Sequence, residues 1–301
     1  MNRLYRLKLL SILLLSSLPL FAQADLFTPP VLQPGAELSV AERGSAYYRF
    51  ERLFVAGNDR HRYYRLDIAI PRRTAPATGY PVVYLLDGNN ALAELKETWL
   101  AELDAGHPPV LVMIGYDTTE RYDMDQRTED YTGPGSANFL QLIQTRIKRL
   151  VETQYPVDPT QQMLWGHSFG GLFVLYALLE NPGAFQTWVA ASPSLWFQPE
   201  TFTKGNHFQG TQQSPARRVL IVRGSKEGKP PIDQFDGGSV ERRNAMLSVP
   251  PDANRRLAQH LASVPGMRVS YQEYPGLTHG EVFDAALHPA LRIAAGLQEA
   301  P

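Results

Sequence analysis

Residues 166–171 read Gly-His-Ser-Phe-Gly-Gly and are the part of the chain best suited to covalent chemistry. A short apolar stretch at 163–165 precedes them, and an apolar segment of helical length at 172–179 follows. A serine in a tight turn between a strand and a helix projects its hydroxyl above the sheet, and flanking glycines, here Gly166 and Gly170, let the backbone bend. The spacing predicts that Ser168 is an activated nucleophile. The absence of cysteine from the chain excludes a thiolate in that role.

A serine hydroxyl needs a base to accept its proton, and the chain offers seven histidines. In hydrolases with this strand–serine–helix arrangement the order along the chain is serine, acid, histidine, which leaves His207, His260, His279 and His288. We expect the base to be His279, because it lies in the loop after the last predicted strand and just before the last predicted helix, from where an imidazole could reach Ser168.

The acid that would orient this histidine is less well defined by the sequence. The apolar stretch 219–222 is followed by Arg-Gly-Ser-Lys-Glu-Gly at 223–228, and an acidic residue just past this strand would occupy the orienting position. Glu227 is the first candidate, Asp233 and Asp236 are alternatives, and a serine–histidine dyad without this acid remains open.

The negative oxygen that forms during acyl transfer requires N–H donors around it. The backbone of Phe169, the residue after the nucleophile, should supply one donor. The second is expected from the segment Asp-Gly-Asn-Asn at 87–90, most simply from the backbone of Asn89. The same segment would also suit an ordinary turn between a strand and a helix.

The elements that position these residues alternate along the chain. Side chains at Tyr64, Leu66, Ile68 and Ile70 are apolar at every second position and predict a half-buried strand, which we expect to pair with residues 46–55 in an antiparallel arrangement. Short apolar runs then alternate with helical patterns, which predicts a mostly parallel central sheet with helices on both faces. The apolar runs lie at 82–86, 110–114, 163–165, 188–191, 219–222 and 269–274, and the helical patterns at 139–151, 172–179, 252–264 and 281–297.

Residues 25–301 are interpreted as a single domain in which 25–45, rich in proline and glycine, form an extended N-terminal arm. Two long polar stretches, 116–135 and 226–251, follow predicted buried strands. We expect both to be loops at the carboxyl edge of the sheet, where open α/β folds bind their ligands.

Residues 1–24 have the features of a secretory signal peptide. Arg3, Arg6 and Lys8 are followed by an apolar run at 9–21 and by small residues at Ala22 and Ala24. We therefore expect cleavage near residue 25 and export to the periplasm, with an uncleaved membrane anchor as the alternative. The formal net charge of −1 then becomes −4, since 26 Lys and Arg would remain against 30 Asp and Glu. A charge of this sign gives no reason to expect a nucleic-acid partner.

With these residues in place, the chain resembles the esterase D-like branch of the α/β-hydrolases over about residues 46–290. The segments that carry the resemblance are 84–89, Tyr-Leu-Leu-Asp-Gly-Asn; 166–171; 191–196, Ala-Ser-Pro-Ser-Leu-Trp; and the loop of His279. Within that branch the chain looks most like the periplasmic trilactone siderophore esterases. The resemblance implies an α/β-hydrolase fold and hydrolysis of the ester backbone of ferric enterobactin-type catecholates, which aids iron release.

The same resemblance leaves two alternatives, an exported esterase for feruloyl or acetyl-sugar substrates and a non-catalytic siderophore-binding protein. No cofactor is expected for serine esterase chemistry, iron would enter only with the substrate, and the oligomeric state is left open.

A ferric tris-catecholate is anionic and has flat rings, so its site should offer arginines and aromatic faces. The candidate substrate-binding residues are Asn90, Arg121, Arg127, Trp196 and Arg223, and any one of these arginines could equally be an ordinary solvated charge.

Overall fold

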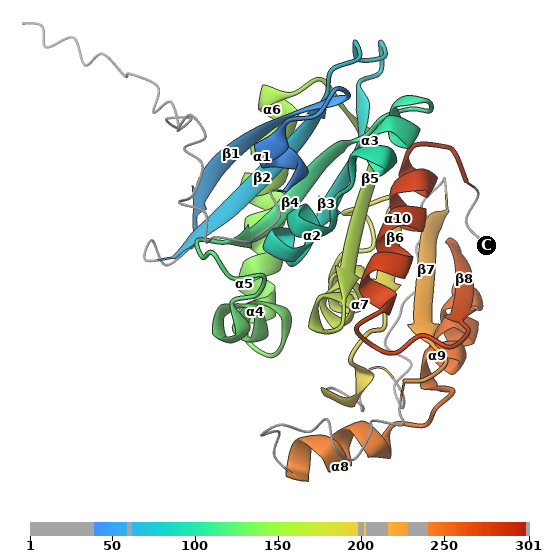
Figure 1. The fold of residues 1–301 in the computed structure, drawn as a ribbon. Helices are drawn as coiled ribbons and strands as arrows, with labels where there is room; N and C mark the ends of the chain where they lie inside the picture. The colour runs from blue at the N-terminus through green and yellow to red at the C-terminus, as the bar shows by residue number, and fades with distance from the viewer. Residues whose placement is uncertain (1–38, 59–61, 198–201, 203–215, 228–239, 299–301) are drawn as a thin grey trace, which may run out of the picture.

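The computed structural model describes residues 39–58, 62–197, 202, 216–227 and 240–298. Within these ranges eight strands form one sheet in the order β1-β2-β4-β3-β5-β6-β7-β8 (Figure 1). The strands are β1 (Tyr48–Ala56), β2 (Tyr63–Pro71), β3 (Tyr80–Leu85), β4 (Val110–Tyr116), β5 (Val157–His167), β6 (Thr187–Ala191), β7 (Arg217–Gly224) and β8 (Met267–Tyr274).

The predicted antiparallel pair, β1 and β2, is present, and β2 also pairs antiparallel with β4. All remaining pairs are parallel. Strands β3 and β4 are buried along their whole length, as expected of the continuous apolar runs at 82–86 and 110–114, because a strand covered on both faces has no polar side to alternate with. The parallel strands therefore deliver their carboxyl ends to one edge of the sheet.

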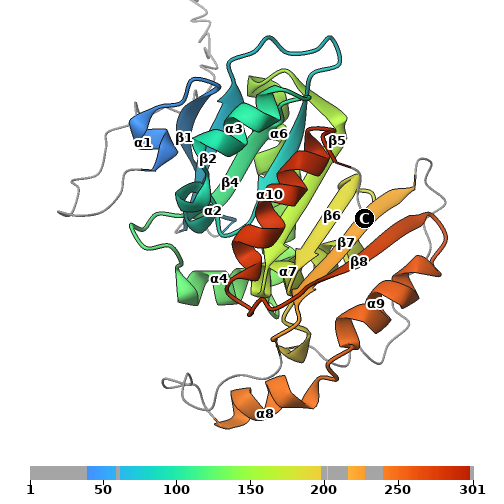
Figure 2. The ribbon, with the colours of Figure 1, turned by 45° about the vertical axis from the view of Figure 1, so that its right-hand side comes forward.

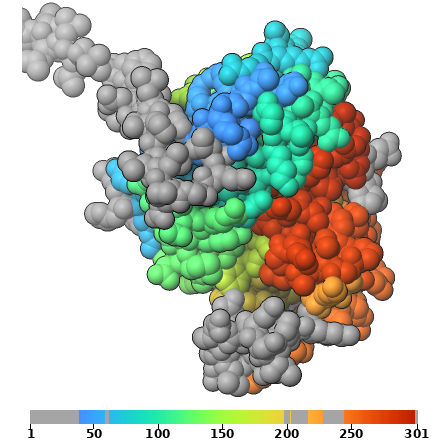
Figure 3. Space-filling view, viewed as in Figure 1, coloured from blue at the N-terminus to red at the C-terminus, as the bar shows by residue number. Residues whose placement is uncertain are grey.

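Helices cover both faces of the sheet (Figures 1 and 2). One face packs in a common apolar core with α1 (Val40–Arg43), α2 (Gly88–Glu94), α3 (Glu97–Asp104) and α10 (Val282–Ala294). In the space-filling view, α10 (red) lies beside α3 (teal), so these helices form one continuous cover (Figure 3). The other face packs against α5 (Gly135–Leu142), a π-helical turn η1 (Ile143–Ile147), α6 (Lys148–Gln154), α7 (Phe169–Glu180) and α9 (Ala253–Ala262).

Several boundaries differ from the sequence-based expectation. Residues 40–43, expected to belong to an extended arm, form α1, which Ser39 and Glu42 cap reciprocally at its N-terminus. The predicted loop 116–135 contains α4 (Met124–Tyr131), and the predicted loop 226–251 contains α8 (Val240–Ser248). These helices are short and polar, so their sequences lack the apolar periodicity that reveals a core helix.

The predicted signal peptide and residues 25–38 lie outside the described residues. In the part of the chain that the structure describes, no helix has the length and apolar character needed to cross a membrane.

Candidate active site

Ser168 lies in a strained turn between β5, which ends at His167, and α7, which begins at Phe169. Its φ of 61° is a conformation that non-glycine residues rarely adopt. Its N–H donates to the carbonyl of Ala191 at 2.9 Å, and its carbonyl accepts from Ser194 N–H at 3.1 Å as well as from Leu172 N–H in the first turn of α7 at 3.0 Å. The serine hydroxyl is thus placed by backbone bonds to the neighbouring strand and its following loop.

The glycines of the motif are explained by steric contacts. A Cβ atom at Gly166 would lie 2.4 Å from the carbonyl oxygen of Gly170, and one at Gly171 would lie 2.8 Å from that of Ala191. A Cβ atom at Gly170 would meet its nearest neighbour, in Leu86, at an ordinary 3.5 Å. The expectation that Gly166 and Gly170 both have to lack side chains is therefore wrong for Gly170, and Gly171 is the second position where close backbone approach excludes one.

The structure brings Ser168, His279 and Glu227 together at the carboxyl edge of the sheet. His279 Nε2 lies 2.9 Å from Ser168 Oγ, and its Nδ1 lies 3.2 Å from Glu227 Oε2. This is the relay geometry in which an imidazole can accept the serine proton while the carboxylate fixes its tautomer. Of the alternative acids, Asp233 and Asp236 both lie outside the described residues.

Glu227 is held as a carboxylate by donors from three directions. Its Oε1 accepts a hydrogen bond from Ser192 Oγ at 2.6 Å and another from the N–H of Gly224 at 2.5 Å. Burial alone would raise its pKa, but hydrogen bonds and charge interactions with His279, followed by the bond from Ser192, lower the pKa below the usual glutamate range. The side chain is 11% exposed and ionised near neutral pH, as an orienting acid requires.

His167, a member of the motif for which the sequence predicts no role, contacts the backbone of His279. Its Nε2–H donates to the backbone carbonyl of His279 at 2.8 Å, and the two rings lie 4.8 Å apart. Burial, with the nearby His279 as the next cause, lowers the pKa of His167 to about 3, so the ring is neutral at neutral pH. Its position beside Ser168 was the available sequence signal, but its contact lies on a loop far along the chain.

The proposed oxyanion donors lie at two helix starts. Phe169 opens α7, and Asn89 is the second residue of α2; N–H groups in the first turn of a helix have no partner within that helix. The side chain of Asn89 is already engaged, since its Nδ2 donates to three carbonyls at and just after the end of β4 and its Oδ1 accepts from Tyr116 N–H. Only the backbone N–H of Asn89 is therefore available as the predicted donor to the oxyanion.

Arg127 is buried against the same region. Its Nε and Nη2 donate to the two carboxylate oxygens of Asp87 at 2.7 and 2.8 Å, and its guanidinium lies 5.4 Å from the ring centre of Phe169. Burial works against its charge, yet Asp87 raises the pKa of Arg127 above the ordinary arginine value. Nε and Nη2 of Arg127 are therefore both bound to Asp87, and these bonds hold the turn that precedes Asn89.

The other two predicted arginines are also engaged. Arg121 is 57% exposed and donates to Asn90 Oδ1 at 2.8 Å and to Glu94. Arg223 is buried and donates to the carbonyls of Glu227, at 2.8 Å, and Pro251. Arg223 thereby connects the orienting acid to the segment between α8 and α9.

A hollow of about 150 Å³ opens beside the triad. Its lining includes His279, Glu227 and Arg223, the segment 192–196 and residues from the end of α8. Trp196 lines the hollow and lies 5.7 Å from the ring of Phe169. Figures 1 and 2 show α8 beyond the carboxyl ends of β6 and β7. Among the described residues, no cluster of three or more His, Asp or Glu could hold a metal ion.

The sequence of this chain is similar to those of known proteins. Residues 58–292 match the family model described as "Putative esterase". The apo-salmochelin esterase of Escherichia coli O6:H1 is 31% identical and aligns over 92% of this chain and 88% of its own length. The ferri-bacillibactin esterase BesA of Bacillus subtilis is also 31% identical, over 80% of this chain and 87% of its own.

Among solved structures, the "Enterobactin and Salmochelin Hydrolase IroE" matches with a TM-score of 0.66 at 32% identity, covering 85% of this chain and 99% of that one. A structure of that hydrolase in complex with DFP matches with the same TM-score at 31% identity. This similarity, together with the sheet order, confirms the predicted α/β-hydrolase fold.

Proposed function

The chain belongs to this esterase family and is a serine esterase, and we propose that it hydrolyses the ester backbone of ferric enterobactin-type catecholate siderophores. The observation that carries the proposal is the continuous hydrogen-bonded series Ser168–His279–Glu227 beside a hollow that is lined by Trp196. The relatives that match most of the chain are named for siderophore esters, and DFP, bound in one matching structure, is a reagent that modifies activated serines.

In the proposed reaction, Ser168 Oγ attacks a lactone carbonyl carbon as His279 Nε2 takes its proton. The backbone N–H groups of Phe169 and Asn89 stabilise the resulting oxyanion. When the ester C–O bond breaks, His279 returns the proton to the leaving alkoxide oxygen, and the acyl group stays on Ser168. A water molecule then attacks this acyl-enzyme, giving its proton to His279, and the carboxylic acid leaves as Ser168 recovers its hydrogen.

We propose that the substrate is recognised by the aromatic ring of Trp196 together with the positive charge of arginines whose side chains the protein holds in place. Trp196 lines the hollow and can receive a catechol ring. Of the three predicted arginines, Arg223 is the one that lines the hollow, while the guanidinium of Arg127 lies against Phe169. Because their N–H groups are bound within the protein, Arg127 and Arg223 would act on an anion through their charge rather than through direct bidentate hydrogen bonds. Arg121 and Asn90, which bind each other, would contact substrate only at the outer rim.

The decisive test is to incubate the purified protein with ferric enterobactin and to follow the products by mass spectrometry. We expect linear trimer, dimer and monomer fragments, each ester cleavage adding one water. A feruloyl ester and an acetylated sugar are tested in parallel under the same conditions. Preferred turnover of either would favour the alternative exported esterase, and binding of the siderophore without any cleavage would favour a binding protein.

We also propose that residues 1–24 are a cleaved signal peptide and that the enzyme acts in the periplasm. The basic start, the apolar run and the small residues at Ala22 and Ala24 support this. Sequencing the N-terminus of the protein recovered from a periplasmic extract should give a first residue near Asp25. Recovery of the unprocessed chain from the cytoplasm would contradict it.

A further inference from the structure

A second hollow lies at the opposite edge of the sheet, where the parallel strands begin. Its volume is about 290 Å³, and its walls come from β3, β5, β6, β7, β8 and the end of α10. Along β5, its residue Met163 precedes Ser168 by five positions, which places the hollow about 16 Å from the serine at the rise per residue of a strand. It is therefore separate from the triad and from the hollow beside it.

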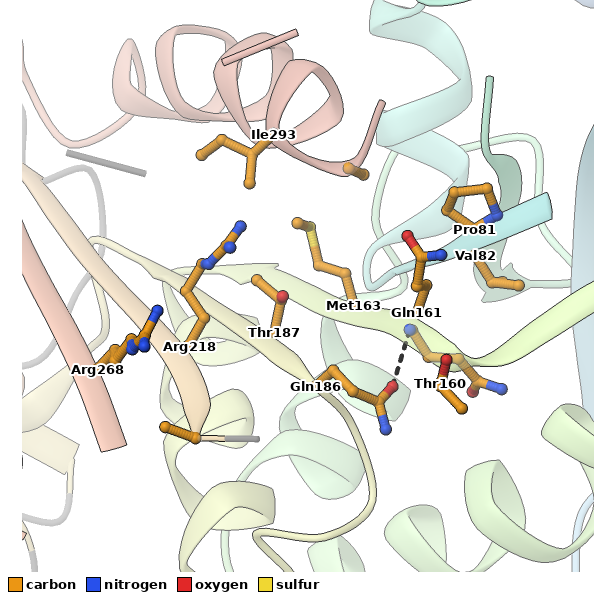
Figure 4. Close-up of a pocket in the computed structure, with 13 residues that line it drawn as sticks. Pro81, Val82, Thr160, Gln161, Met163, Gln186, Thr187, Arg218, Arg268 and Ile293 are labelled. Atoms are coloured by element: carbon orange, nitrogen blue, oxygen red, sulfur yellow. Dashed lines mark hydrogen bonds between the residues drawn. The ribbon is translucent and has the colours of Figure 1, made fainter. Parts of the chain in front are cut away.

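The base of this hollow is a row of side chains that crosses four strands. Met163 is in register with Thr187, Thr187 with Arg218, and Arg218 with Arg268. Neighbouring strands are about 4.8 Å apart, and residues in register point to the same face. Figure 4 shows Met163, Thr187 and Arg218 extending from the sheet toward Ile293 of α10.

The row lies on a face of the sheet that is otherwise covered. Two and four residues after Arg218, Leu220 and Val222 occupy the same face of β7 and are buried in the core that contains α10. Helix α10 ends at Ala294, so the helical cover of this face of the sheet ends at the level of Arg218 and Arg268. The sheet face is therefore open at this edge, and two cations occupy positions that hold apolar side chains elsewhere.

No acidic residue is among the described residues that line the hollow. Both arginines are exposed, and the side chain of neither forms a hydrogen bond or ion pair with another described residue. Like charges in register on neighbouring strands repel each other. At the other end of the row, Met163 and Ile293 are 3% and 6% exposed and supply an apolar wall. Along the row, the lining of the hollow is therefore apolar at Met163, carries a hydroxyl group at Thr187 and is positively charged at Arg218 and Arg268.

We propose that this hollow binds a small aromatic carboxylate. The carboxylate would lie between the guanidinium groups of Arg218 and Arg268, whose planar donors match its two oxygens. The ring would extend along the row over Thr187 and pack against Met163 and Ile293, where thioether–aromatic contact is favourable. This site does not depend on the proposed siderophore substrate, since it shares no residue with the triad.

Benzoate is the probe for the first test, with binding followed by isothermal titration and by amide chemical shifts. We expect the Arg218→Gln/Arg268→Gln double variant to bind benzoate at least tenfold more weakly than the unsubstituted protein. The matched control is Arg149→Gln, which removes a positive charge from an exposed position on α6 and should bind benzoate normally. Equal affinity in the double variant, or no measurable binding by the unsubstituted protein, would overturn the proposal.

Three further measurements define the ligand class and the place. Ser168→Ala should retain benzoate binding, whereas loss of binding there would locate the probe at the triad and refute the second site. Inorganic phosphate and benzyl alcohol should both bind more weakly than benzoate, because each lacks either the ring or the charge; equal binding of phosphate would refute the aromatic part of the proposal. Ala294→Phe, which fills the apolar end of the hollow, should weaken benzoate binding while leaving both arginines in place.

Discussion

The proposed nucleophile, Ser168, and the proposed base, His279, are held in different ways. Ser168 is fixed by its own neighbours in the chain: a strand ends before it, a helix begins after it, and close backbone contacts exclude side chains at Gly166 and Gly171. His279 lies in a loop after β8, its side chain is 44% exposed, and its contacts come from distant elements. The comparison teaches that local backbone sterics place the nucleophile, whereas tertiary hydrogen bonds place the base.

The largest expected effect is that of Ser168→Ala. Without the hydroxyl no acyl-enzyme can form, so we expect kcat to fall by about 10⁴-fold or more, with residual turnover only from the remaining donors. The free energy of unfolding should change little, because the backbone of the turn is kept. Kinetics with a chromogenic ester and a urea melt check both points. Activity close to that of the unsubstituted enzyme would refute the mechanism.

Glu227→Gln tests the tertiary support of the base. An amide cannot accept from Nδ1–H and stabilise the imidazolium as the carboxylate does, so kcat should fall by about 10³-fold. The matched control is Glu281→Gln, which neutralises an exposed carboxylate in the His279 loop that binds Thr278. That control should stay within about twofold of the unsubstituted rate. If Glu227→Gln did the same, the base would be oriented without this acid and the site would act as a dyad.

The local support of the nucleophile is tested by a pair of glycine variants. Gly166→Ala would place a methyl group 2.4 Å from the Gly170 carbonyl oxygen and should reduce the free energy of unfolding by about 1–3 kcal/mol. Gly170→Ala has ordinary van der Waals room and should reduce it by clearly less. Chemical denaturation of both variants measures the difference. Equal losses would mean that the steric contact at Gly166 is relieved by a small backbone shift.

His167→Phe removes the donor behind His279 while keeping an aromatic ring of similar size. The carbonyl of His279 would lose its partner, so the imidazole should be positioned less well, and kcat should fall about tenfold with little change in KM. A proportional rise in KM without loss of kcat would assign His167 to substrate binding instead.

The same variant has a pH signature. The pKa of His167 is lowered to about 3 in the folded protein and lies near 6.5 in the unfolded chain. The unfolded state therefore binds the proton more readily, and the stability contributed by neutral His167 is complete above pH 6.5 and is lost as the pH falls toward 3. Between pH 7.5 and 4.5 the unsubstituted protein should lose about 2.7 kcal/mol more stability than His167→Phe, since the unfolded chain alone binds the proton over about two pH units at about 1.36 kcal/mol each. Parallel pH dependences would contradict the buried neutral state.

Much of the site could be predicted because its signals are contiguous. The strand, the motif and the apolar helix around Ser168 are neighbours in the sequence, and His279 follows the last strand directly. Helices α4 and α8 lie in segments that the sequence predicts to be loops, because their polar sequences carry no apolar period. The free side chains expected at Arg127 and Arg223 are instead bound to Asp87 and to backbone carbonyls. No residue pattern indicates in advance which partner an arginine will meet after folding.

The sequence by itself determined the turn that presents Ser168, the proposed nucleophile, the strand and helix on either side of it, and the mostly parallel sheet. These follow from steric limits on the backbone and from apolar periodicity, both of which act between close neighbours in the chain. Only the tertiary structure decided that Glu227 and His167 contact His279. Glu227 and Ser168 contact His279 across 52 and 111 positions of the chain, so their meeting depends on the strand order that carries each loop to the same edge.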